Sequence, residues 1–114
     1  MPPDRDRDSL EDMLSYAREA TEAVRDRRPR DLETDRFFSL ALQRLVEVIG
    51  EAAARVSSQT REWYPQVPWR RMIGMRNRLI HGYDLVDPEV LWSTLIQDLP
   101  ALIDILERVL DEPL

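Results

Sequence analysis

Apolar residues recur every three or four positions along almost the whole chain, and this spacing constrains the fold more than any other feature of the sequence. Such spacing gathers the apolar side chains on one face of successive α-helices. No segment has the alternating pattern that indicates a half-buried strand. With 114 residues, the chain fits one domain around one modest core. We therefore expect an all-α fold: an up-and-down bundle of four to five helices, forming a single domain over residues 9–114.

The first two helices are expected to differ in their surroundings. Residues 1–8 lack apolar periodicity and are expected to form a flexible tail, so that Ser9 caps the first helix. A second, central helix is expected over residues 32–57, with an apolar face that starts at Phe37. Gly50 inside this helix costs about 1 kcal/mol relative to Ala. That cost predicts the close approach of another backbone at Gly50.

Prolines and glycines mark the ends of the later helices. Pro68 is well placed to open a helix over residues 69–81, and Gly82 can supply the left-handed residue that ends it. The dipeptide Asp87-Pro88 predicts the cap and first residue of a last helix. Pro100 lies inside this helix and removes a backbone donor, so we expect a kink or a short break there.

The charges are distributed unevenly. The chain has a net charge of −6 and no Cys, which excludes disulfides and thiolate metal sites. Residues 70–83 nevertheless contain four arginines and no acid, whereas residues 84–114 contain eight acids and Arg108 as their one base. A basic island in an acidic protein indicates a local anion site. No apolar run is long enough to span a bilayer and none resembles a signal peptide, so we expect a cytoplasmic protein without membrane association.

The segment 76–83 combines the residue types that phosphodiester cleavage needs. It contains two arginines, an asparagine, the single histidine of the chain and a tyrosine. Asn77 and His81 share one helix face. Imidazole exchanges protons near neutral pH, and guanidinium binds phosphate oxygens in a bidentate manner. Together they are sufficient for metal-independent RNA cleavage with the 2′-hydroxyl as nucleophile, so no metal or cofactor is expected. The alternative is that His81 is simply a helix C-terminal residue favoured by the dipole.

A longer pattern surrounds this segment. Arg76, His81 and Tyr83 form an Arg-x4-His-x-Tyr motif. The accompanying segments, in chain order, are Ile49-Gly50-Glu51-Ala52, Pro68-Trp69, Ile73-Gly74-Met75-Arg76-Asn77, His81-Gly82-Tyr83, Asp87-Pro88, Trp92 and Leu99-Pro100. This ordered series covers roughly residues 9 to 110 and resembles the HepT-like toxins of the HEPN domain family.

The resemblance implies a homodimer whose two motifs share one cleft. It also implies an endoribonuclease that acts as a toxin and is paired with a nucleotidyltransferase antitoxin. On the matching positions, Arg76 would be the phosphate clamp, His81 the acid and base, and Asn77 a residue that orients one of them. Tyr83 would be the tyrosine to which the antitoxin adds adenylate groups; its alternative is a packing role.

Two arginines outside the motif complete the expected site. Arg78 and Arg71 are expected to bind the RNA substrate, although plain solvent exposure is the alternative for Arg78. A second hypothesis is a non-catalytic adaptor, whose cleft binds a nucleotide or positions a substrate for a separate nucleotidyltransferase. Only the ribonuclease requires His81 for RNA cleavage.

Overall fold

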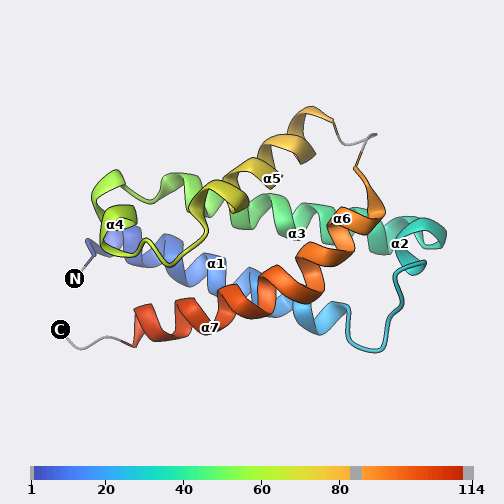
Figure 1. Ribbon diagram of the computed structural model, residues 1–114, viewed down its shortest axis with the longest axis horizontal. Helices are drawn as coiled ribbons and strands as arrows, with labels where there is room; N and C mark the ends of the chain where they lie inside the picture. The colour runs from blue at the N-terminus through green and yellow to red at the C-terminus, as the bar shows by residue number, and fades with distance from the viewer. Residues whose placement is uncertain (1, 83–85, 112–114) are drawn as a thin grey trace.

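The computed structural model describes residues 2–82 and 86–111, and these residues form helices and connecting turns without any strand. The all-α bundle predicted from the sequence is thereby confirmed (Figure 1). In chain order the helical elements are α1 (Asp4–Ala23), α2 (Asp31–Thr34), α3 (Arg36–Arg55), α4 (Ser58–Trp63), α5 (Trp69–His81), α6 (Pro88–Ser93), the π-helical η2 (Thr94–Asp98) and α7 (Leu99–Leu110).

Three layers of helices are visible in Figure 1, in which α1 and α7 lie below α3, and α5 lies above it. Helix α1 packs on both α3 and α7, and α3 packs on α5. The start of α1 and the end of α7 both lie on the left of this view. None of the described helices has both the length and the hydropathy needed to cross a bilayer. The side chains that fill the centre are Leu10, Met13, Leu42, Ile49, Leu95, Leu102 and Leu106.

Helix α1 begins at Asp4, so the predicted start at Ser9 and the predicted tail over residues 1–8 are wrong for residues 4–8. The reason is a tertiary contact. Asp6 is 3% exposed, and its carboxylate accepts hydrogen bonds from the amide and the hydroxyl of Ser57 at 3.0 and 2.6 Å. It also accepts one from the Thr60 hydroxyl at 2.6 Å. Burial alone would raise the pKa of Asp6, but these hydrogen bonds outweigh it and hold the pKa below its usual value.

The predicted second helix is divided at Asp35. Its carboxylate accepts a hydrogen bond from the Phe38 amide at 3.1 Å, so Asp35 caps a new helix, α3, instead of continuing the old one. The phase of the predicted apolar face is also wrong at its start, because Phe37 is 83% exposed. Phe38 faces the protein instead, with the guanidinium of Arg27 3.8 Å from its ring centroid. The connector after α3 also contains a helix that its prolines did not indicate, α4, which Ser57 caps.

Gly50 lies where α3 meets α5, and the predicted backbone approach at this glycine is confirmed. A Cβ atom at Gly50 would clash with the Cβ of Arg76 and would lie 2.5 Å from the carbonyl oxygen of Met72. Only a residue without a side chain allows the two helices to come this close. Gly50 therefore fixes the distance of α5 from the body of the protein.

The last helix is continuous from α6 to α7. As predicted, Asp87 caps it by accepting a hydrogen bond from the Glu89 amide at 2.9 Å, and Pro88 is its first residue. Pro100 has no amide hydrogen to donate, so it interrupts the α-helical hydrogen bonding as expected. The helix nevertheless continues past Pro100 without a break. The π-helical turn η2 lies directly before α7, and Pro100 occupies the first turn of α7, where no amide donor is needed.

Candidate active site

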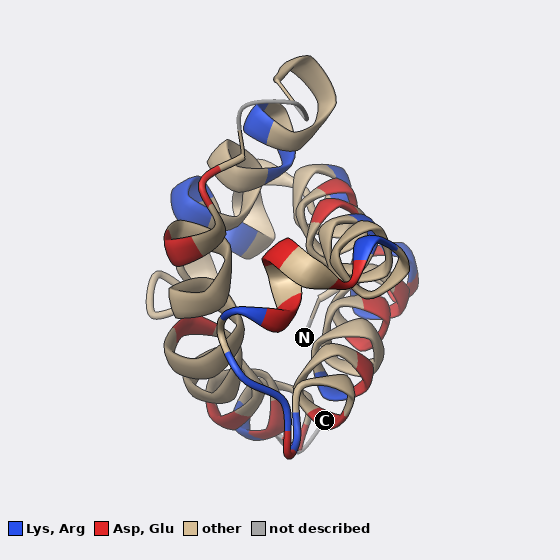
Figure 2. Cartoon of the chain, turned by 90° about the vertical axis from the view of Figure 1, so that its right-hand side faces the viewer, with Lys and Arg blue, Asp and Glu red and all other residues tan. Residues whose placement is uncertain are grey.

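Helix α5 carries the basic island and has the bounds that the sequence predicted, Trp69–His81. Its buried residues are Met72 and Leu79, which face its main packing partner α3. Gly82 ends the helix with φ of −148°, so the predicted left-handed conformation is wrong. A hydrogen bond of 2.9 Å from the Gly82 amide to the Arg78 carbonyl closes the last turn without it. The blue segments of α5 lie at the top of Figure 2, and red segments occur on the helices below.

The Arg76 side chain is packed at its Cβ atom, but its Nε atom lacks a hydrogen bond to a described residue. Its Cβ packs against Gly50, so the side chain leaves α5 at the contact with α3. Its Nε atom is buried and has no hydrogen-bond partner among the residues that the structure describes. A buried, charged donor without a partner is costly, and such groups usually have a ligand, a water molecule or an ion as partner. Arg76 is therefore a candidate for binding an anion.

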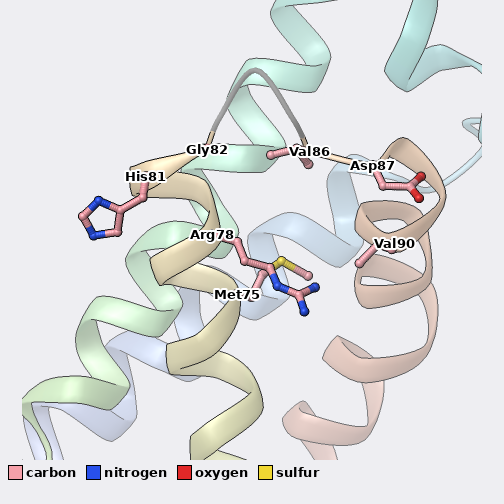
Figure 3. A pocket seen from close by; sticks show the side chains of 7 residues that line it. All are labelled: Met75, Arg78, His81, Gly82, Val86, Asp87 and Val90. Atoms are coloured by element: carbon pink, nitrogen blue, oxygen red, sulfur yellow. The ribbon is translucent and has the colours of Figure 1, made fainter.

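His81 is the last residue of α5 and is exposed. It belongs to the wall of a cavity of about 430 Å³ between α5 and α6, together with Arg78 and Val90. Figure 3 shows that the imidazole is directed away from this cavity, whereas Arg78 and Met75 point into it. The carboxylate of Asp87 points away from Arg78 in the same view. Within one copy of the chain, the imidazole therefore faces outward.

The other predicted site residues lie elsewhere around α5. Asn77 is exposed and lines a cavity of about 1000 Å³ beside the turn that precedes α5. Arg71 lines the same cavity. Arg71 forms an ion pair of 2.8 Å with Asp98. Arg78 has no ion pair with a described residue. Tyr83, the predicted modification site, lies outside the described residues. The structure thus distributes the predicted residues over several sides of one helix.

Two further residues of α5 were not assigned from the sequence. Arg70 and Gly74 line the cavity that contains Asn77, and both also line a neighbouring cavity of about 310 Å³. Their spacing contained a signal, because positions 70, 74, 77 and 81 recur at intervals of four, three and four, which places them on one helix face. Arg70, Asn77 and His81 are exposed along this face.

The comparisons with known proteins identify the family of this chain. The sequence profile of the family described as "Ribonuclease HepT-like" matches residues 13–109. A protein of Thermococcus cleftensis named "Probable ribonuclease HepT" is 36% identical over 96 residues, covering 84% of this chain and 87% of that protein. A "Putative RNase" of Methanocaldococcus jannaschii is 34% identical over 93 residues, covering 82% of this chain and 85% of that protein.

A third relative, a "Putative RNase" of Caldanaerobacter subterraneus subsp. tengcongensis, is 33% identical over 93 residues, covering 82% of this chain and 83% of that protein. No solved structure matches the chain at a significant level. The family profile spans most of the sequence, and the matches with the three relatives include most of each protein. The chain belongs to the HepT-like ribonuclease family.

Proposed function

We propose that this chain is a metal-independent endoribonuclease that works as a homodimer and as the toxin of a type II toxin–antitoxin pair. The observation that carries the proposal is Arg76, whose buried Nε lacks a partner among the described residues, on the same helix as the single histidine. A guanidinium in this state binds the non-bridging oxygens of a phosphodiester. The family adds the class of reaction, because its members are ribonucleases by description.

The reaction is a displacement at phosphorus. The imidazole of His81 accepts the proton of the RNA 2′-hydroxyl, and O2′ forms a bond to phosphorus while the bond from phosphorus to O5′ breaks. An imidazolium donates a proton to the leaving O5′. The products are a 2′,3′-cyclic phosphate and a 5′-hydroxyl. Arg76 stabilises the negative charge that develops on the phosphoryl oxygens, and Asn77 orients the reacting groups.

Two features favour a dimeric site. Base and acid act on opposite sides of phosphorus in an in-line displacement, and one chain contains one histidine. Two copies would supply His81 and His81 of the partner subunit for these two roles. In addition, Ile80 beside the motif is 40% exposed, and Phe37 and Leu40 on α3 are 83% and 42% exposed. The start of α3 and the end of α5 lie toward the same side of Figure 1, so these apolar residues suit an interface near the site.

The activity is tested with purified protein and single-stranded RNA in the presence of EDTA. We expect cleavage to continue, with cyclic phosphate among the products. His81→Ala should reduce the rate by about 10²–10⁴-fold, and Arg76→Ala by about 10²–10³-fold. Arg76→Lys should recover only part of the loss, because an ammonium cannot replace the bidentate fork. Arg108→Ala removes the same charge from α7 and should cleave as wild type does.

Two results would reject this mechanism: loss of cleavage on addition of EDTA, or full cleavage by His81→Ala. Sedimentation of the same preparation should give a dimer at micromolar concentration. A stable monomer that still cleaves RNA would reject the shared site while leaving the ribonuclease in place. Binding of a nucleotide without any cleavage would favour an adaptor role instead.

The proposal includes control by a nucleotidyltransferase antitoxin. Tyr83 follows His81 by two residues, and we propose it as the acceptor of adenylate groups. Each added adenylate brings a negative phosphate close in sequence to Arg76 and Arg78. These phosphates would occupy the guanidiniums that RNA needs, and the added nucleoside would obstruct access to His81. Inhibition would then need no refolding of the domain.

A further inference from the structure

Two cavities meet on the exposed side of α5. The larger, of about 1000 Å³, lies between α5 and the turn before it, and the smaller, of about 310 Å³, extends to Val90 in α6. Both are lined by Arg70, Arg71 and Gly74, so they form one continuous groove across the helix. The smaller cavity shares Arg78 with the cavity beside His81. The imidazole of His81 points away from that cavity, but it shares a face of α5 with Arg70, Gly74 and Asn77, which line the groove. Along this face the groove leads toward the imidazole.

The wall of this groove is basic on one side and apolar on the other. No acidic residue lines either cavity in the described part of the chain. The Arg70 side chain is exposed and makes no hydrogen bond or ion pair to a described residue. The apolar side consists of Pro65, Trp69 and Ile73. A hydrogen bond of 3.0 Å from Trp69 Nε1 to the Tyr64 carbonyl fixes the indole. This combination suits a phosphate with a planar base attached.

Gly74 lies where the two cavities meet, and no contact among the described residues requires a glycine there. A Cβ atom at this position would meet no atom within 4 Å, in contrast to Gly50. A glycine inside a helix costs about 1 kcal/mol relative to alanine. Gly74 thus makes the helix less stable than alanine would, at the point where the groove crosses the helix. Glycine at such a place allows an external backbone to come close to the helix.

We propose that single-stranded RNA lies in this groove, with its sugar-phosphate backbone crossing α5 at Gly74. Arg70 binds a phosphate, and one unpaired base occupies the cavity walled by Trp69 and Ile73. This inference rests on the proposed ribonuclease function and names the path by which the substrate reaches His81. A second copy of the chain fits the groove less well, because a symmetric contact at Gly74 would bring the Arg70 side chains of both copies together.

The path is tested by separating binding from catalysis. Binding of a short fluorescein-labelled single-stranded RNA is measured by anisotropy in the His81→Ala background, and cleavage is measured in otherwise wild-type protein. Gly74→Ala should raise the melting temperature yet weaken RNA binding by about tenfold, because the added methyl group keeps the RNA backbone from approaching the helix. Arg70→Ala should weaken binding and reduce the slope of log affinity against log salt by about 0.7. Arg108→Ala is the control of equal charge, and RNA duplex should bind less well than single strand.

Each opposite result has a distinct meaning. If Gly74→Ala and Arg70→Ala bind and cleave as Arg108→Ala does, the path is wrong while the ribonuclease stands. If Gly74→Ala dissociates the dimer, the groove belongs to a second copy, and the path is again wrong. Equal affinity for duplex RNA would reject the base-binding cavity. If the wild type neither binds nor cleaves RNA, both the path and the proposed function fail.

Discussion

The carboxylate of Asp6 accepts three hydrogen bonds from residues about fifty positions away, and this contact decides where the first helix begins. Ser57 also caps α4, so the same group of side chains connects the start of α1 to the end of α3. Asp6 could not be recognised from the sequence, because nothing in its local pattern distinguishes it from the exposed Asp4 and Asp8. Its role depends on partners that only folding brings near.

Asp6→Asn should lower the free energy of unfolding by about 1.5–3 kcal/mol at neutral pH, the usual contribution of a hydrogen bond to a charged group. The pKa of Asp6 is below its ordinary value of 3.8 in the fold. The stabilisation that the Asp6 carboxylate gives is therefore complete above pH 3.8. It is lost as the pH falls through the pKa that Asp6 has in the folded protein. Urea unfolding at neutral pH and at about pH 3 measures both effects. Asp12→Asn, on the exposed side of the same helix, is the control, and an equal loss from both variants would contradict the prediction.

At the scale of the elements, the contact between α3 and α5 depends on Gly50. Gly50→Ala should destabilise the protein by about 1–3 kcal/mol, because overpacking outweighs the better helix propensity of alanine. The ribonuclease rate should fall as well, because Arg76 leaves α5 at this contact. Thermal unfolding together with the cleavage assay measures both. For thermal stability alone, Gly74→Ala is the matched comparison, with the opposite expected sign. A Gly50→Ala protein more stable than wild type would show that α5 does not pack here.

The helices that the sequence predicted well have strong local signals at their ends. Pro68 and Gly82 bracket α5, and Asp87-Pro88 begins α6, and the structure has these bounds. The division of the second helix at Asp35 was missed because the competing signal, a cap, is weak beside a long apolar period. Phe37 was assigned to the core because it continues the apolar spacing, but the buried face of α3 runs through Leu42 and Val46 and leaves Phe37 exposed. The ends of a helix could thus be predicted where a proline or a glycine marks them.

The whole molecule brings the site residues to one helix but not to one cavity. The motif identified Arg76 and His81 as candidates, because their types and spacing are local. Sequence spacing could not show that the imidazole faces away from the cavity of Arg78, or that Asp98 binds Arg71. Both facts depend on how α6 and η2 lie beside α5, and that depends on packing across the entire bundle.

Control by a partner also belongs to this scale. When the chain is expressed together with the proposed nucleotidyltransferase antitoxin, intact-mass measurement should show added adenylate groups. Tyr83→Phe should carry none and should remain toxic in the presence of the partner, because the hydroxyl that accepts adenylate is gone. The ring is retained, so a packing role alone would leave the behaviour of Tyr83→Phe close to that of wild type. Adenylate on the Phe variant, or neutralisation of unmodified wild type, would show that another residue is the switch.

The start of α1 and the end of α7 lie together, far from the place where α5 ends. Arg7 donates a hydrogen bond of 3.1 Å to the Leu110 carbonyl, and Arg18 forms an ion pair of 3.3 Å with Glu107, so the first and last helices run side by side. In Figure 1 the start of α1 and the end of α7 are on the left, whereas α5 ends at the upper right. A fluorophore or an affinity tag attached to a side chain at the start of α1 or the end of α7 would therefore stand clear of His81, and the labelled protein could be immobilised with the end of α5 facing solution.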